Sequence, residues 1–338
     1  MPDTPDTVVQ AADQPTGIRT RLYRGGILEL DAFPVADVSE HLQHEDAVVW
    51  IDLIDPDRFA LDVVAEELSL HALALEDALT RHERPKVHRY REHLFVSAVH
   101  VRLVDTSGEL TLTEVSAFVT PRALVTVHAP GFPIEDVIAG WDSSADLVEH
   151  GVAYLLHGLL DVVVDSHFDA VRALDEELDG LEDLLFADSP PPNLVQRRTF
   201  ELRKSVVLLR RVVLPMREVV NTLLRRDLGI VPGPLVPYYQ DVYDHVLRAT
   251  EWTESLRDLV STVLETHLTI QGNRLNSVMK KVTGWAAIIA VPTAVTGFYG
   301  QNVPYPGFGH ALGFWTSTIA IVTLSALLYG VFRYRDWI

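Results

Sequence analysis

The longest hydrophobic stretch of the chain lies near its C-terminal end. From Val282 to Phe332 the sequence contains no Asp, Glu, Lys or Arg. A Gly- and Pro-rich turn at 303–309 divides this stretch into two apolar runs, Val282–Gly300 and Ala311–Phe332. Each run is close to the ~20 residues that a helix needs to cross a hydrocarbon core. We therefore predict two transmembrane helices over these runs, joined by an external loop at 301–310.

Charged residues around this hairpin predict its orientation in the membrane. Basic residues precede the first run and follow the second: Arg274, Lys280, Lys281, Arg333 and Arg335. The connecting loop contains no Lys or Arg, only His310. Because Lys and Arg are enriched on the cytoplasmic side, both termini should face the cytoplasm, including a tail at 333–338. The chain is expected to be a multi-pass protein of the cell membrane.

A single long helix is predicted to lead into the first span. Residues 228–237 contain three prolines and two glycines, but from Tyr238 to Gly300 only Gly residues and Pro292 interrupt the helical pattern. The part before the membrane, 237–281, is assigned as a stalk helix. A helix of about 60 residues is roughly 90 Å long. Such a rod cannot bury its own apolar surface, so we expect a homo-oligomer.

Two further long helices are predicted upstream, as an antiparallel hairpin over 144–236. The first, Asp146–Ala187, has an acidic end, and the second runs from Asn193 to about Asp227 and is basic. The acids are Asp175, Glu176, Glu177, Asp179, Glu182 and Asp183, and the bases are Arg197, Arg198, Arg203, Lys204, Arg210 and Arg211. Opposite charges favour pairing across the hairpin. Two separately solvated faces are the alternative, since exposed ion pairs contribute little.

The N-terminal part is predicted to be an α+β cytoplasmic domain over 17–143, after a disordered tail at 1–16. Alternating or clustered apolar residues predict strands, and helical spacing between them predicts helices. The strands are Ala47–Leu53, His93–Leu103, Thr111–Thr120 and Ala123–His128, and the helices are Asp57–Leu68 and His71–Thr80. The later strands are expected to be antiparallel. The fold class is thus an α+β domain followed by long helices and a two-helix C-terminal transmembrane region.

Composition narrows the function classes. The net charge is −19, which disfavours nucleic acid as a partner and makes divalent cations plausible ones, although most of these carboxylates need do no more than keep the protein soluble. There is no cysteine, so thiolate metal sites are excluded. The sequence contains no Gly-rich phosphate loop, GxSxG elbow or HExxH motif, so it predicts no enzyme.

One line of the long helix is polar or small, with Met279 as its only bulky apolar member. Positions alternately four and three apart form it: Glu251, Ser255, Asp258, Thr262, Glu265, Thr269, Gly272, Asn276, Met279, Thr283, Ala286, Ala290, Thr293, Gly297 and Gly300. A second line, Val242, Ala249, Leu256, Val263 and Ile270, is apolar. The polar line fits either close helix packing or a water-filled channel. Its acidic members favour the channel, because they cannot be buried unpaired, and Glu265 is a candidate metal-binding residue there.

Several motifs then resemble a known family, the CorA-type divalent cation transporters. The similar segments are Asn273–Lys280, Pro292-Thr293, Tyr299-Gly300-Gln301-Asn302, Trp50–Leu53, Leu75-Glu76-Asp77, Arg84–Val87 and Tyr239–His245. The resemblance covers nearly the whole chain after residue 16. It implies a funnel-shaped homopentamer in the lipid bilayer that moves Mg2+, and often Co2+ or Ni2+, down its gradient without ATP or an organic cofactor.

The resemblance also implies roles for particular residues. Gly300, Gln301 and Asn302 belong to an outer selectivity filter that holds a hydrated ion through its water shell. The implied pore lining is Asn276, Met279, Val282, Thr283, Ala286, Ala290, Thr293 and Gly297. Asp77 and Asp241 match an intersubunit site that senses cytoplasmic Mg2+. Without that role, Asp77 is a solvated residue and Asp241 a partner of the helix dipole.

Two departures from the family pattern leave the transported ion open. Gln301 replaces the signature methionine, and the outer loop has no acidic residue. The runner-up is therefore proton-coupled Zn2+ transport, as in the family's zinc branch. A third hypothesis is a membrane-anchored cation sensor that conducts nothing. The spans carry no acidic residue or histidine to move protons, and a plain anchor does not require a polar line.

Overall fold

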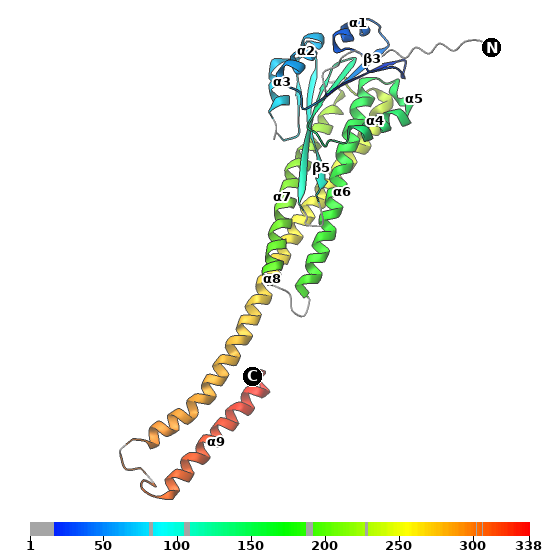
Figure 1. Cartoon of the computed structure of the whole chain (residues 1–338). Helices are drawn as coiled ribbons and strands as arrows, with labels where there is room; N and C mark the ends of the chain where they lie inside the picture. Colours follow the sequence, from blue (N-terminus) through cyan, green and yellow to red (C-terminus); the bar gives the residue numbers. More distant parts are fainter. Residues whose placement is uncertain are drawn as a thin grey trace, which may run out of the picture. The chain divides into compact units, whose positions relative to one another are not determined.

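The computed structural model describes residues 17–80, 84–104, 109–186, 192–226, 229–301, 303–305 and 307–338. The tail predicted to be disordered, 1–16, lies outside the described residues. The chain divides into two compact units, Met1–Ser261 and Thr262–Ile338. Figure 1 shows the elements of both units.

The first unit is built on a seven-stranded mixed sheet with strand order β2-β1-β3-β7-β6-β5-β4. The β3–β7 pair is parallel, and all the other pairs are antiparallel. The strands are β1 Ile18–Arg24, β2 Ile27–Asp31, β3 Ala47–Ile54, β4 Lys86–Arg89, β5 Leu94–Leu103, β6 Leu110–Val119 and β7 Ala123–His128. The four predicted strands are therefore confirmed to within one or two residues, and β5, β6 and β7 are antiparallel as expected.

Both faces of this sheet are buried. Trp50 of β3 and Leu124 of β7 pack on the side of α4 and α6, whereas their neighbours Ile51 and Val125 pack on the side of α2 and α3. Strands covered on both faces need apolar residues at nearly every position. This requirement explains the composition of β7, in which every residue is buried and all but Thr126 and His128 are apolar.

Short helices surround the sheet. They are α1 Val38–His41, α2 Arg58–Leu68, α3 Ala72–Leu79, α4 Ile134–Ser143 and α5 Ala145–Val148, with 3-10 turns at Val35–Asp37 and Gly233–Leu235. Asp57 caps α2 by accepting a hydrogen bond from the backbone N–H of Ala60, which explains why this helix begins directly after Asp55-Pro56. Helices α2 and α3 match the two predicted helices.

Long helices complete the unit. Helix α6 (Val152–Phe186) packs on β5, where His167 contacts the carbonyl oxygen of Val99 through Nε2 at 2.8 Å. Helix α7 (Pro192–Leu223) runs antiparallel to α6, and α8 (Val236–Tyr299) begins in this unit (Figure 1). The predicted start of the first long helix at Asp146 is wrong. A turn containing Gly151, with φ of 69°, separates α5 from α6.

The charged faces of α6 and α7 do not pair with each other in the part of the chain that the structure describes. Arg197 pairs with Glu201 in its own helix, and Arg210 pairs with Glu254 of α8 at 2.6 Å. No described ion pair joins the acidic end of α6 to the basic residues of α7. The hairpin is held by buried apolar residues such as Leu174 and Leu209, so solvated faces describe its charges better.

The second unit contains the rest of α8 and helix α9 (Ala311–Tyr334), which run antiparallel (Figure 1). Gly284 of α8 is buried, and a Cβ built there would lie 3.1 Å from the Ile338 side chain. The rings of Trp285 and Tyr329 lie 6.5 Å apart between the same two helices. Both α8 and α9 contain a segment long and apolar enough to cross a membrane, which agrees with the predicted transmembrane hairpin.

Candidate functional site

The polar line of α8 is exposed at every position. In the first unit Glu251, Ser255 and Asp258 are exposed, and in the second unit so are the remaining twelve members, from Thr262 to Gly300. Asp258 forms an ion pair with the neighbouring Arg257 at 2.8 Å. The other acids, Glu251 and Glu265, lie on the same exposed face.

The apolar line of α8 is buried over most of its length. Val242, Ala249 and Leu256 are fully buried and Val263 is nearly so, while Ile270 is 36% exposed. The two lines therefore lie on different sides of the helix, one against the folded chain and one against solvent. The sequence predicted this division from periodicity alone.

The segment of α8 directly before the membrane span is exposed along its whole length. Every residue from Gln271 to Lys280 is exposed, including Leu275 and Met279, which are 65% and 54% exposed. Val282, at the start of the span, is 59% exposed. Contiguous exposed apolar surface of this kind marks a contact with lipid or with another chain.

The C-terminal end of α8 is closed by a folded loop. The Gly300 N–H donates to the Thr296 carbonyl at 2.8 Å, and a Cβ on Gly300 would lie only 2.9 Å from that oxygen. The Gln301 N–H donates to the Phe298 carbonyl at 3.3 Å, and the Gln301 side chain is exposed. Asn302, the third predicted filter residue, lies outside the described residues.

Aromatic rings hold the loop against this helix end. The ring of Tyr305 lies 4.9 Å from that of Tyr299 and 5.2 Å from that of Phe308. Gly313 at the start of α9 approaches Gly307 so closely that a Cβ there would be 2.7 Å from the Gly307 carbonyl oxygen. The residues around the tetrapeptide are thus fixed by packing from both helices.

Threonine hydroxyls in the span bond to their own helix. Thr293 donates to the Ile289 carbonyl at 3.2 Å, and Thr296 donates to the Pro292 carbonyl at 2.8 Å. In these bonds the hydroxyl proton is used and the oxygen lone pairs remain available. Thr293 belongs to the exposed polar line, so it presents an acceptor oxygen on that face.

The two predicted sensor carboxylates have different surroundings. Asp77, on α3, accepts a hydrogen bond from Lys86 of β4 at 2.8 Å, and its side chain is 24% exposed. Asp241, on α8, is 67% exposed and lies 3.9 Å from His245. Within one chain, no group of three or more Asp, Glu or His side chains among the described residues is placed to hold a metal ion. The structure therefore does not bring Asp77 and Asp241 into a metal site in a single subunit.

A row of ionisable residues on α6 faces Asp241. Asp161, Asp165 and His157 lie four residues apart along this helix, opposite Asp241 and His245 of α8. Burial raises the pKa of Asp165, and the charge of Asp161 raises it further. Burial lowers the pKa of His157, against the charges of Asp161 and Asp241, which raise it. We did not single out these residues from the sequence, although a four-residue spacing signals one helix face.

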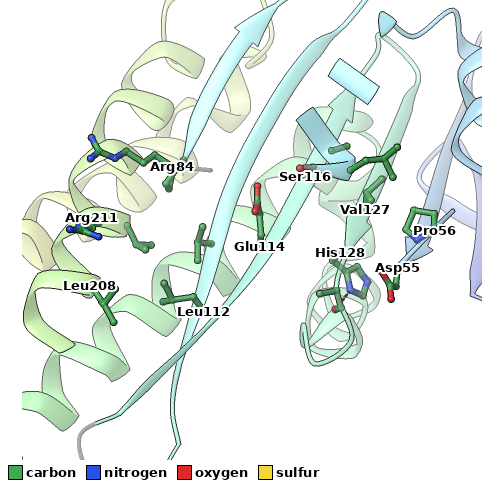
Figure 2. A pocket seen from close by; sticks show the side chains of 16 residues that line it. Asp55, Pro56, Arg84, Leu112, Glu114, Ser116, Val127, His128, Leu208 and Arg211 are labelled. Atoms are coloured by element: carbon green, nitrogen blue, oxygen red, sulfur yellow. Dashed lines mark hydrogen bonds between the residues drawn. The ribbon is translucent and has the colours of Figure 1, made fainter. Parts of the chain in front are cut away.

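A cavity of about 650 Å³ lies between the sheet and α7 (Figure 2). Its lining carries both signs of charge: Asp55, Arg84, Glu114, His128 and Arg211. Figure 2 places Arg84 and Arg211 at one end and Asp55 and His128 at the other. His128 bonds to the buried Asp52 at 3.2 Å. Burial lowers the His128 pKa, but Asp52 and the hydrogen bond to the Ala129 carbonyl together raise it above its usual value. This cavity was not predicted from the sequence.

Comparison with known proteins gives these features a context. The family model described as "CorA-like Mg2+ transporter protein" matches residues 45–334. The cobalt/magnesium transport protein CorA of Thermotoga maritima is 28% identical, over 99% of this chain and 96% of its own. The complete CorA magnesium transporter of Methanocaldococcus jannaschii superposes with a TM-score of 0.77 at 21% identity, covering 96% of this chain and all of that one. The full-length CmaX protein gives a TM-score of 0.69 at 20% identity, covering 96% and 99%.

The similarity to solved structures shows the shared fold, and the match to the family model shows the family to which the chain belongs. The match takes in most of the sheet, the long helices and both candidate spans. It agrees with the resemblance carried by the tetrapeptide at the end of α8 and by the upstream motifs. The chain belongs to the CorA-like Mg2+ transporter family and is a divalent cation transporter of the membrane.

Proposed function

We propose that five copies of this chain form a funnel-shaped channel that moves hydrated Mg2+ passively into the cell, with Co2+ and Ni2+ as secondary substrates. The observation that carries the proposal is the exposed polar line of α8, which lies opposite a buried apolar line on the same helix. Around a symmetry axis, five such faces enclose a polar conduit. The Mg2+ and cobalt transport named for relatives supports the choice of ion.

The outer filter is assigned to Gly300, Gln301 and Asn302. Backbone carbonyls and side-chain amides from five subunits supply oxygen acceptors for the waters around an ion. This arrangement suits Mg2+, which gives up its water reluctantly and is therefore recognised through its hydration shell. The side chain of Gln301 is exposed. Because it is one methylene longer than an asparagine side chain, its amide is available at the pore mouth.

The remaining pore residues divide by chemistry. Asn276 and Thr293 supply polar rings, and Met279 with Val282 forms the hydrophobic constriction, which can gate by excluding water. Between these rings the pore is kept wide by small residues, which are Thr283, Ala286, Ala290 and Gly297. All of these side chains are exposed in the single chain, as a pore lining requires before assembly.

Gating is assigned to cytoplasmic Mg2+ at Asp77 and Asp241 of neighbouring subunits. A bound ion links the two carboxylates and holds the closed ring, and its loss leaves like charges that repel. The high exposure of Asp241 and the absence of a complete metal site in one described chain both fit a site shared between subunits. Glu265, exposed on the polar line, is a second cation-binding position in the stalk.

Proton-coupled Zn2+ transport is the less favoured alternative. Coupling requires groups that gain and lose protons along the path, and the stretch from Val282 to Phe332 contains no Asp or Glu and only His310, which lies in the loop. A non-conducting anchor is also disfavoured, because it does not require a continuous exposed polar line. Both spans are assigned to the cell membrane. Both termini are assigned to the cytoplasm, because the basic residues flank the two spans on that side.

The test is ion flux into liposomes that contain the purified full-length protein. We expect Mg2+ uptake along its gradient, at the same rate with and without a proton gradient. Uptake of Zn2+ only when protons flow inward would replace this proposal by the zinc alternative. No flux of either ion through a correctly assembled oligomer would support the non-conducting anchor.

A further inference from the structure

An ion pair within one subunit occupies one of the two sensor carboxylates. The ammonium of Lys86 lies 2.8 Å from Oδ2 of Asp77. Both side chains are mostly buried, with 21% and 24% exposure. A pair this short and this shielded from water is stronger than the exposed ion pairs on the helices.

The sheet fixes the position of Lys86. Residue 86 is the first residue of the edge strand β4 and is paired in register with Ser97 of β5, so the β4–β5 pairing holds its backbone in place. Its ammonium also lies 5.8 Å above the centre of the Phe95 ring, and Phe95 is fully buried. The cation–π contact and the strand together hold the charge at Asp77 in the free protein.

A divalent cation at Asp77 has to take the place of this ammonium. Two cations on one carboxylate repel each other strongly, and more so where water is partly excluded. The charges of both residues also affect the neighbouring Tyr90. Burial and the charge of Asp77 raise the pKa of Tyr90, and the charge of Lys86 lowers it. The Mg2+ affinity of Asp77 is therefore the difference between two competing interactions.

We propose that Lys86 is an internal competitor that sets the Mg2+ concentration at which the Asp77 sensor fills. The inference rests on the proposed function of Asp77 as a regulatory ligand. It adds a residue and a mechanism to that function: the closed state forms only when Mg2+ is abundant enough to displace a tethered ammonium. When no Mg2+ is bound, the charge of Lys86 offsets that of Asp77. Lys86 therefore also weakens the repulsion between Asp77 and the carboxylate of the neighbouring subunit.

The test measures how Mg2+ stabilises the full-length protein in detergent, as the rise of its thermal unfolding midpoint during an Mg2+ titration. We expect Lys86→Gln to lower the half-saturating Mg2+ concentration roughly three- to tenfold, the range of a partly buried ion pair. Lys86→Arg, which keeps the cation, should stay near the wild type. Lys204→Gln is the matched control, because it removes an exposed lysine of α7 that has no ion pair among the described residues.

The outcomes separate this inference from the function on which it rests. An unchanged or higher half-saturating concentration for Lys86→Gln overturns the competitor role. Asp77→Asn should weaken the Mg2+ response; if it does so while Lys86→Gln has no effect, only the competitor role is lost. If Asp77→Asn leaves the titration unchanged, the sensor role of Asp77 fails and the inference fails with it.

Discussion

The ring of Tyr305 packs edge-on against the ring of Tyr299, with centroids 4.9 Å apart and planes at 70°. This contact joins the last residue of α8 to the loop beyond the proposed filter. Such a pair contributes about 0.5–1.5 kcal/mol beyond the area that it buries. Packing between these two rings therefore ties Tyr305 of the loop to the end of α8, next to Gly300 and Gln301 of the proposed filter.

Tyr305→Ala should lower Mg2+ flux severalfold, because it removes the ring contact that ties the loop to the end of α8 beside the proposed filter. Tyr305→Phe keeps the ring contact and should conduct like the wild type. Flux into liposomes measures both, with oligomer size checked by chromatography. Equal flux in the two variants would show that the ring contact does not support the filter.

Asn302→Ala should abolish transport and leave the oligomer assembled, because it removes an amide acceptor from each subunit of the proposed ring. Gln301→Met, which restores the residue usual in the family, should keep transport. The ratio of Mg2+ to Co2+ flux in Gln301→Met then reports how the glutamine affects selection. Substantial flux through Asn302→Ala would remove Asn302 from the filter.

Neutralising both sensor carboxylates, as Asp77→Asn with Asp241→Asn, should relieve inhibition by Mg2+ on the cytoplasmic side. The reason is that the double variant leaves neither carboxylate of the proposed intersubunit site to hold the closing ion. Flux is compared at low and high Mg2+ on the cytoplasmic face of oriented liposomes. Glu176→Gln, at the exposed acidic end of α6, is the control for lost surface charge. Inhibition that persists in the double variant contradicts the sensor assignment.

His167 should make the protein sensitive to acid. Burial lowers its pKa to about 4, while its Nε2 remains bonded to the Val99 carbonyl. The unfolded chain binds this proton near pH 6.5, so the stability that His167 contributes is lost as pH falls from about 6.5 to about 4. The loss is about 3 kcal/mol.

His167→Gln can still donate to Val99 but does not titrate. Its thermal unfolding midpoint should therefore fall less than that of the wild type between pH 7 and pH 4. Parallel pH curves for wild type and His167→Gln would rule out the buried neutral histidine.

His128 contributes to stability with the opposite sign. Its pKa is raised by Asp52 against the effect of burial, so its stabilisation is present below about pH 6.5 and is lost as pH rises further.

Features that depend on local periodicity could be predicted from the sequence. The two spans, the stalk helix and the separation of α8 into an exposed polar line and a buried apolar line all follow from spacing along one helix. Helical geometry relates residues three and four apart, so one chain segment contains the whole signal. The family resemblance rested on Tyr299–Asn302 and on other short motifs along the chain, because each motif is contiguous in the sequence.

Tertiary structure alone decided which distant residues meet. Strands β1, β2 and β4 and helix α4 were not predicted, because short elements gain their stability from neighbours in the sheet rather than from their own pattern. The contact of Lys86 with Asp77 and the row of α6 carboxylates facing Asp241 join separate elements. The spacing of charged residues along the sequence does not show which residues of separate elements will pair. The opposite charges of α6 and α7 predicted ion pairs that the described residues do not make. Ordering two long exposed side chains costs about as much free energy as their ion pair contributes.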